Sequence, residues 1–179
     1  MGKKLIVVAF VFIVIAALLI WSFYNHESNH IDDQLLAAFS EVHDGKGVSQ
    51  AAAFAGSGPH PIVLLTSSGG RCDWTDSVPL EWRSENMTDI QLVVTVGEEQ
   101  EIILGSCDYT GGPSITRYQY SVEVNLREAN TGKIVASTTL YGSEPRHCGQ
   151  TEERSVTRLE GSRVQFDQLE EWLRQYVAP

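Results

Sequence analysis

The most regular alternation of apolar and polar residues lies between Cys107 and Cys148. From Arg117 to Arg127, every second residue is apolar or aromatic, and the residues between are polar or charged. The apolar set is Tyr118, Tyr120, Val122, Val124 and Leu126, and the polar set is Arg117, Gln119, Ser121, Glu123, Asn125 and Arg127. Successive side chains of a strand point to opposite faces, so this pattern predicts a half-buried antiparallel strand.

A tight turn follows this strand. Ala129-Asn130-Thr131-Gly132 has the composition of a type I turn closed by a left-handed glycine. The turn predicts a register that keeps one apolar face on both strands of a long hairpin. The predicted pairs are Val122 with Leu140, Val124 with Thr138, and Leu126 with Ala136. We expect the hairpin tip, Asn130, Thr131 and Gly132, to be free to meet a partner.

Three shorter stretches predict the remaining strands. Ile62 to Thr66 is a short apolar run of the kind found in covered strands. Ile90 to Val96 alternates, and Ile102 to Leu104 follows a charged turn at Gly97 to Glu101. With the hairpin, these stretches predict an antiparallel β-meander of four strands plus the early strand.

The C-terminal segment changes to helical spacing. Its apolar residues share one face: Phe166, Leu169, Trp172, Leu173, Tyr176 and Val177. Asp167 and Glu170 have the spacing of a capping box. One amphipathic helix must bury its stripe against another element, so we predict an α+β fold in which this helix packs on the antiparallel sheet.

The N-terminal 24 residues have a different character. An uninterrupted apolar run from Leu5 to Trp21 follows Lys3 and Lys4. The run is long enough to span a bilayer and lacks the small-residue cleavage site of a signal peptide, which is the alternative interpretation. We predict a cytoplasmic stub and transmembrane signal anchor at residues 1–24. By the positive-inside rule, the N-terminus lies in the cytoplasm and the rest of the chain lies outside.

A less regular segment connects the anchor to the sheet. Ile31, Leu35, Leu36, Phe39 and Val42 recur at helical spacing, and a glycine- and alanine-rich stretch follows from Gly45 to Gly58. We predict a stalk helix and flexible linker at residues 25–58, before an extracytoplasmic α+β domain at 59–179. The helix could instead pack on that domain or lie on the membrane.

Charge restricts the partners. The chain carries 13 basic and 23 acidic side chains, a formal net charge of −10. Nucleic acids and anionic lipid surfaces are bound through clustered Lys and Arg, so both are disfavoured for the folded part. Acidic pairs such as Asp32-Asp33 lack the spacing of a calcium loop. We therefore expect no cofactor and no nucleic acid, but a membrane anchor and a protein partner in the cell envelope.

Three cysteines allow one disulfide. Thiols outside the membrane tend to oxidise, and Cys107 and Cys148 fall at the same end of the predicted sheet, opposite the hairpin turn. We predict a Cys107–Cys148 bridge with Cys72 left as the odd thiol. A zinc site is the alternative, but no two cysteines have the C-x₂₋₄-C spacing of zinc ligands.

Several segments resemble a set of uncharacterised bacterial single-pass membrane-anchored proteins. They are Gly58 to Leu64, Cys107 to Gly112, Thr131 to Lys133 with the following chain to Cys148, and Trp172-Leu173. That group has no assigned activity, so the resemblance implies a topology and no catalytic residues. The hairpin is also similar to hairpins of envelope assembly lipoproteins.

The sequence contains no catalytic motif. G-x-S-x-G, H-E-x-x-H, S-x-x-K and the P-loop pattern are all missing. We therefore predict no catalytic, cofactor-binding or metal-binding residues, and favour a membrane-tethered extracytoplasmic interaction or sensory domain over an enzyme. The alternatives are an extracytoplasmic hydrolase whose site comes from residues distant in sequence, and an accessory protein of envelope assembly.

Overall fold

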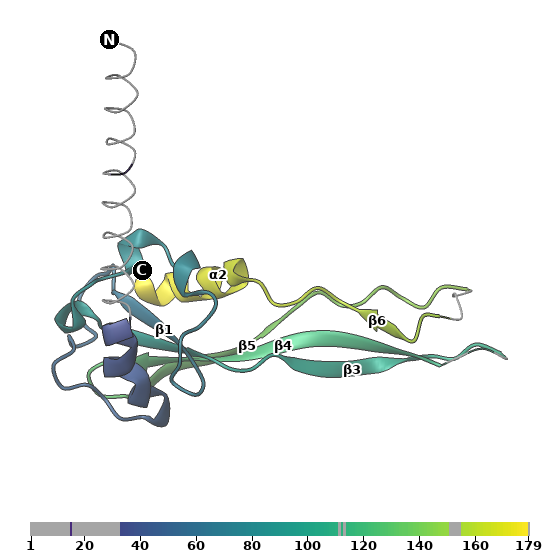
Figure 1. Cartoon of the computed structure of the whole chain (residues 1–179), viewed down its shortest axis with the longest axis horizontal. Helices are drawn as coiled ribbons and strands as arrows, with labels where there is room; N and C mark the ends of the chain where they lie inside the picture. The colour runs from purple at the N-terminus through teal and green to yellow at the C-terminus, as the bar shows by residue number, and fades with distance from the viewer. Residues whose placement is uncertain (1–14, 16–32, 111, 113, 151–154, 179) are drawn as a thin grey trace, which may run out of the picture.

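The computed structural model describes residues 15, 33–110, 112, 114–150 and 155–178 (Figure 1). A helix at residues 33–39 leads directly into the 3₁₀ helix η1. The other elements, in chain order, are η1 (Ser40–Asp44), β1 (Ile62–Thr66), η2 (Thr75–Ser77), η3 (Leu80–Trp82), η4 (Met87–Asp89), β2 (Leu92–Val96), β3 (Gln100–Cys107), β4 (Ile115–Glu128), β5 (Ile134–Tyr141), β6 (Arg158–Glu160) and α2 (Phe166–Val177). The α+β class is confirmed.

The sheet has six strands and is mixed, so the predicted all-antiparallel meander is wrong. β4 is the central strand, with β2, β3 and β5 antiparallel to it and β6 parallel. β1 runs parallel to β2 at the edge. The parallel pairs require long connections across the fold, which strand-by-strand patterns cannot reveal.

The predicted turn at Gly97 to Glu101 does not reverse the chain. β2 pairs with Val124 to Glu128 of β4, and β3 pairs with Ile115 to Ser121, both antiparallel and in nearly the same register. The N–H of Gly97 donates to the carbonyl oxygen of Glu123 at 2.7 Å, which keeps the chain beside β4 through the bend. β3 therefore continues the line of β2 on one side of β4.

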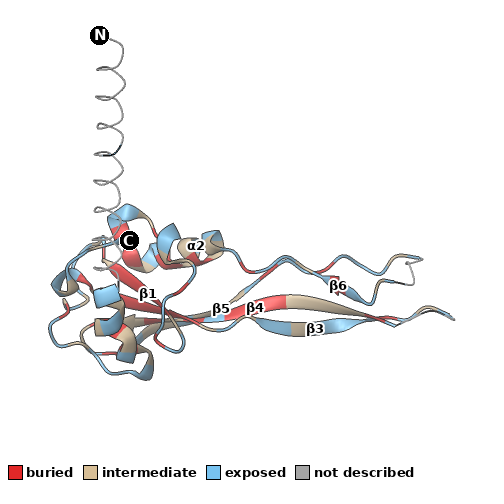
Figure 2. Cartoon of the chain, in the orientation of Figure 1, coloured by how far each residue is buried: buried red, intermediate tan, exposed pale blue. Residues whose placement is uncertain are grey.

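The hairpin register is confirmed. Val122 lies opposite Leu140, Val124 opposite Thr138, and Leu126 opposite Ala136. Gly132 has the left-handed conformation that the turn requires, with φ of 72°. The apolar face of this hairpin is accordingly buried along the second half of β4 (Figure 2).

Each face of the sheet has its own core. The face under α2 buries Leu64, Val94, Val124 and Leu126 against Leu169 and Leu173, among other residues. The opposite face buries Val63, Leu65 and Val93 against Phe39 and Val42. β1 and β2 are thus covered on both sides, as the apolar run at Ile62 predicted.

Apolar residues from the described part of the expected stalk and linker, residues 33–58, lie on this second core. Phe39, Val42 and Ala51 are buried, and Leu35 and Leu36 are partly buried beside them. Of the three alternatives for the helix, packing on the domain is the one seen in the residues that the structure describes. The boundary at residues 58 and 59 stays a prediction.

The terminal helix α2 is confirmed, but its capping differs. The N–H of Gln165 donates to Oε1 of Gln168, so the reciprocal box lies two residues before the predicted pair. Glu170 instead forms an ion pair with Arg174. Helix boundaries of this kind depend on where the preceding chain leaves the sheet, and a local motif does not fix that.

Among the described residues, no helix is both long and apolar enough to cross a membrane. The anchor predicted at residues 1–24 lies outside the described residues except for Ile15.

The molecule divides into a head and an arm. The head contains both cores, the helix at 33–39, α2, β1, β2, β5 and the second half of β4. The arm contains β3, the first half of β4, β6 and the chain that joins them, and it extends well away from the head (Figure 1). β4 belongs to both, and its 14 residues span about 45 Å at roughly 3.3 Å per residue.

Candidate functional site

The predicted disulfide closes the far part of the arm. Cys107 at the end of β3 is bonded to Cys148, with Cα atoms 5.7 Å apart. Cys107 packs with Ile115 and Leu159 in a small buried cluster on one face of the arm. The bridge therefore fixes the returning chain, residues 142–150 after β5, to the end of β3, where few apolar contacts hold it.

Hydrogen bonds hold the returning chain on the same face. The guanidinium of Arg117 donates to the carbonyl oxygens of Pro145 at 3.0 Å and Arg146 at 3.2 Å. The hydroxyl of Tyr109 donates to the carbonyl oxygen of Gly149 at 3.0 Å. These bonds satisfy backbone groups that have no strand partner there.

Two Gly-Ser pairs join the strands where the arm meets the head. The N–H of Ser143 donates to Oγ of Ser162 at 3.1 Å, and the N–H of Ser162 donates to Oγ of Ser143 at 2.8 Å. A Cβ on Gly142 would lie 1.9 Å from the oxygen of Ser162, and one on Gly161 would lie 1.7 Å from that of Ser143. Only glycine permits this approach.

The opposite face of the arm carries tyrosines stacked under arginines. The guanidinium of Arg158 lies 3.9 Å from the ring centre of Tyr118, and that of Arg163 lies 4.9 Å from the ring centre of Tyr120. Such cation–π contacts are worth about 0.5–1 kcal/mol at exposed sites. We call Tyr118, Tyr120, Arg158 and Arg163 the stacked face.

Carboxylates complete this stacked face. Arg158 forms ion pairs with Glu101 and Glu160, both at 2.7 Å, and Arg163 pairs with Glu99. The hydroxyl of Tyr120 donates to Oε2 of Glu160 at 2.8 Å. These contacts join β3, β4 and β6 across a part of the molecule that has little core.

The same contacts shift the pKa values of Glu160 and Tyr120. The hydrogen bond from Tyr120, and then that from Arg158, lower the pKa of Glu160 below its ordinary value. Sharing its proton with Glu160 raises the pKa of Tyr120, with burial adding to the effect. Both shifts favour the ionised carboxylate and the neutral phenol, the state that holds the network together.

A cleft of about 440 Å³ lies where the arm meets the head. Its lining includes Cys72, Trp74, Val122, Glu99 and Arg163. The Cys72 thiol is 5% exposed, and burial raises its pKa, which opposes thiolate chemistry. Among the charged residues of the lining, Glu99 pairs with Arg163, and Arg71 pairs with Asp76.

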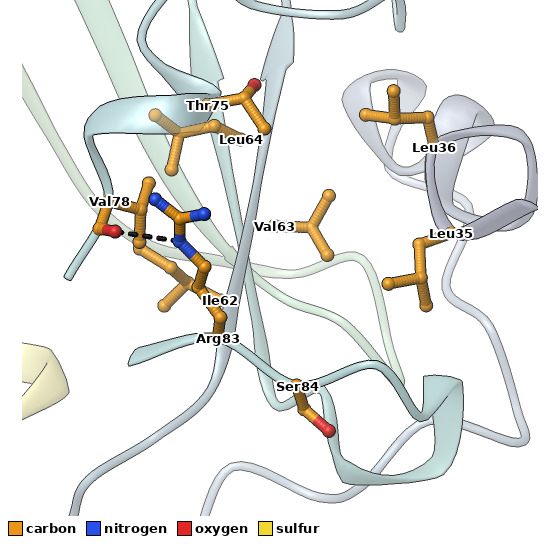
Figure 3. Close-up of a pocket in the computed structure, with 9 residues that line it drawn as sticks. All are labelled: Leu35, Leu36, Ile62, Val63, Leu64, Thr75, Val78, Arg83 and Ser84. Atoms are coloured by element: carbon orange, nitrogen blue, oxygen red, sulfur yellow. Dashed lines mark hydrogen bonds between the residues drawn. The ribbon is translucent and has the colours of Figure 1, made fainter. Parts of the chain in front are cut away.

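A second cavity lies beside β1, between the helix at 33–39 and the η2–η3 segment (Figure 3). Its volume is about 50 Å³, far below the 300–1,000 Å³ or so typical of ligand pockets. Arg83 closes one side by donating from Nε to the carbonyl oxygen of Val78 at 2.7 Å. This cavity is a packing gap.

Comparison of the chain with protein-family models, with curated proteins and with solved structures gave no match. Geometry and chemistry are therefore the grounds for a functional proposal.

The hairpin tip lies against the head instead of projecting from it. The Nδ2 of Asn130 donates to the carbonyl oxygens of Ala51 at 2.9 Å and Ser49 at 3.2 Å. Gly132 is buried, and a Cβ there would lie 2.3 Å from the oxygen of Gly45. Thr131 is exposed. A role of Asn130, Thr131 and Gly132 in binding a partner stays a prediction.

Metal ligands do not gather in the described part of the chain. No group of three or more His, Cys, Asp or Glu side chains there could hold a metal ion. His60, the buried histidine, instead bonds through Nδ1 to Oε1 of Gln91 at 2.8 Å and packs edge-on against Phe54. That arrangement ties the entry of β1 to the start of β2.

Sequence reasoning missed the arm as a separate structural part. Tyr118 and Tyr120 stand in the apolar set of β4, which predicted burial under α2. Arginines some 40 positions later in the chain cover them instead. The available signal was the length of β4, whose alternation begins well before the residues that α2 can reach.

Proposed function

We propose that this chain is a membrane-tethered interaction module of the cell envelope, which presents its arm to a protein partner outside the cytoplasm. The observation that carries the proposal is the arm itself. It extends beyond both cores, yet a disulfide, the stacked face and two Gly-Ser pairs stiffen it.

An ordered arm lowers the free energy of unfolding of the isolated chain, because ordering its backbone costs more than its own apolar contacts return. Ordering one backbone residue costs about 1–2 kcal/mol, and the arm returns little of this through apolar burial. Its buried cluster consists of Cys107, Ile115 and Leu159. Preorganisation of that kind reduces the ordering cost of binding, which favours a recognition surface.

The chemistry of the arm favours a protein partner. The stacked face combines tyrosine and arginine, residues enriched in protein interfaces, and Ile103 beside it is 66% exposed. The excess of acidic side chains over the whole chain argues against nucleic acid.

Two features support the tether and the outer location. The apolar run from Leu5 to Trp21 suits a signal anchor. A Cys107–Cys148 disulfide is stable in an oxidising compartment and rare in the cytosol.

Site-specific photo-crosslinking in native membranes tests this proposal. A photoreactive residue at Ile103 should give a protein adduct because that side chain is exposed on the arm. The matched control is Leu80, which is 80% exposed on η3 of the head and should give none. Adducts at Leu80 alone, or equal adducts at both positions, would contradict an arm-specific role.

The cleft where the arm meets the head supports the alternative of an extracytoplasmic hydrolase. It has ligand-like volume and carries Asp73 and Glu99 in its lining. Hydrolysis of generic ester or peptide substrates by the purified full chain, lost in Asp73→Asn or Glu99→Gln, would favour this alternative over the interaction module.

A further inference from the structure

β5 forms an open edge of the sheet in the head. Among the described strands, β4 is its one neighbour. The eight residues Ile134–Tyr141, IVASTTLY, contain no charge and no proline, and Ser137, Thr139 and Tyr141 are exposed. An edge of this composition is a template for pairing with another strand.

The backbone groups that point away from β4 can be assigned. Gly142, which follows β5, donates its N–H to the carbonyl oxygen of Tyr120 at 2.9 Å. Bonded and non-bonded pairs alternate in an antiparallel ladder, so Leu140 and Thr138 also point toward β4. Ser137, Thr139 and Tyr141 therefore direct their N–H and C=O groups outward. The outward direction of the Tyr141 carbonyl is consistent with the hydrogen bond that it accepts from Nε2 of Gln168 on α2 at 2.8 Å.

The other long edge strand is protected along its length, whereas β5 is irregular only at its start, where the register shifts at Val135. β3 has a bulge between Ile103 and Gly105, and Glu101 lies within the strand. Bulges and charges are the usual devices that stop edge-to-edge pairing. β5 has neither between Ala136 and Tyr141, where its pairing with β4 is regular.

α2 presents an uncharged flank above this edge. The bond from Gln168 to Tyr141 places that flank, which carries Gln168, Trp172, Gln175 and Tyr176 by helical spacing. The rings of Trp172 and Tyr176 lie 5.4 Å apart and are only partly buried beside Ala136 and Leu140. Asp167, Glu170 and Arg174 lie elsewhere on the helix, and Glu171 lies at the border of the flank, beside Gln168 and Gln175.

We infer that the edge of β5 and this flank of α2 form the interface with a second copy of the chain, the two β5 strands pairing antiparallel about a two-fold axis near Thr139. That pairing sets Thr139 opposite Thr139 and Ser137 opposite Tyr141, so outward backbone groups of one copy meet those of the other. The two sheets become one, and both α2 helices lie on the same face with their aromatic flanks toward the axis.

Self-complementarity favours a second copy as the occupant. Two chains of net charge −10 repel each other least through a surface with few acidic side chains. Strand Ile134–Tyr141 and the flank of α2 together provide one. In this register no two like charges lie opposite each other. Opposed like charges would weaken the cross-strand pairs. The inference does not depend on the proposed role of the arm.

Light scattering of the full chain in detergent, over a range of protein concentrations, tests the inference. The wild type should show twice the chain mass of 19.8 kDa at high concentration and dissociate on dilution. Thr139→Pro removes one outward N–H per copy and leaves the ladder to β4 intact. Thr139→Lys sets two ammonium groups opposite each other at the axis. Each should raise the dissociation constant on the order of tenfold or more.

The matched control is Ile103→Lys, which adds the same charge to the other exposed edge strand and should leave the dissociation constant unchanged. Circular dichroism should show that all three variants keep the native fold. A wild type with one chain mass at every concentration would overturn the inference. So would a dimer that resists both Thr139 variants, or one that Ile103→Lys weakens equally.

Discussion

Opening the Cys107–Cys148 bridge should destabilise the head as well as the arm. The two cysteines are 41 positions apart, and the chain-entropy estimate for such a loop is about 4 kcal/mol at 25 °C. The loop contains β4 and β5, whose residues Val122, Val124 and Leu126 belong to the core under α2. If head and arm unfold as one unit, the loss of this constraint lowers the free energy of unfolding of the whole.

Urea unfolding of the full chain in mild detergent, followed by tryptophan fluorescence, measures this effect. Trp74, Trp82 and Trp172 pack in the core of the head and report on the head, not on the arm, and the fourth tryptophan, Trp21 of the predicted anchor, is replaced by Phe in every protein compared. With a urea dependence of about 2 kcal/mol/M, the Cys107→Ser/Cys148→Ser variant should unfold at about 2 M less urea than the wild type.

Cys72→Ala is the control, because it removes a buried thiol without opening a loop. Its midpoint should exceed that of the double variant. Equal midpoints for the two variants would refute the coupling of arm and head. A tyrosine near-UV signal that changes before the tryptophan signal would show instead that the arm unfolds as a separate unit.

Four further outcomes are expected. Gly142→Ala should lower the melting temperature by several degrees, since its Cβ would lie 1.9 Å from the oxygen of Ser162, whereas Ser106→Ala on exposed β3 should not. Leu173→Ala should cost about 3 kcal/mol in urea unfolding because Leu173 is fully buried, and Trp172→Ala, only partly buried, should cost less. The folded pKa of Glu160 lies below its unfolded value, so the stability that this carboxylate contributes is present above the unfolded pKa and is lost as pH falls through the folded pKa. Glu160→Gln should remove that part of the acid dependence of the melting temperature. Asn130→Ala should cost about 1 kcal/mol by removing the two bonds to residues 49 and 51, measured by thermal unfolding.

The hairpin and its register could be predicted because local chemistry fixes them. Alternation along β4 assigns the buried face, and a turn that needs a left-handed glycine at Gly132 sets the pairing to Thr138 and Leu140. The Cys107–Cys148 bridge was predicted by continuing that register, although β5 ends at Tyr141 and β6 takes its place beside Thr116 to Tyr118. The hairpin itself depends on residues close in sequence.

Features that depend on distant residues could not be predicted. A run such as Gly97-Glu98-Glu99-Gln100 is typical of a reversing turn, but here Gly97 bonds to Glu123 and the chain continues beside β4 as β3. The apolar face of residues 35–42 indicates burial but not the surface that buries it. Nor does the sequence of the hairpin tip indicate that residues 45–51 cover it. The tyrosines of the stacked face likewise do not indicate which arginines lie over them.

A shared strand also has a mechanical meaning. β4 passes without interruption from the arm into the head, with Ile115 to Ser121 on one side of the junction and Val122 to Glu128 on the other. Its two halves have equal length, and the Gly-Ser pairs lie beside the residues where the halves meet. The Cys107–Cys148 bridge joins the end of β3 to the chain that follows β5, so a load applied at the bridge is shared by these two segments of the arm. A force on the bridged end of the arm would therefore reach the core under α2 through β4.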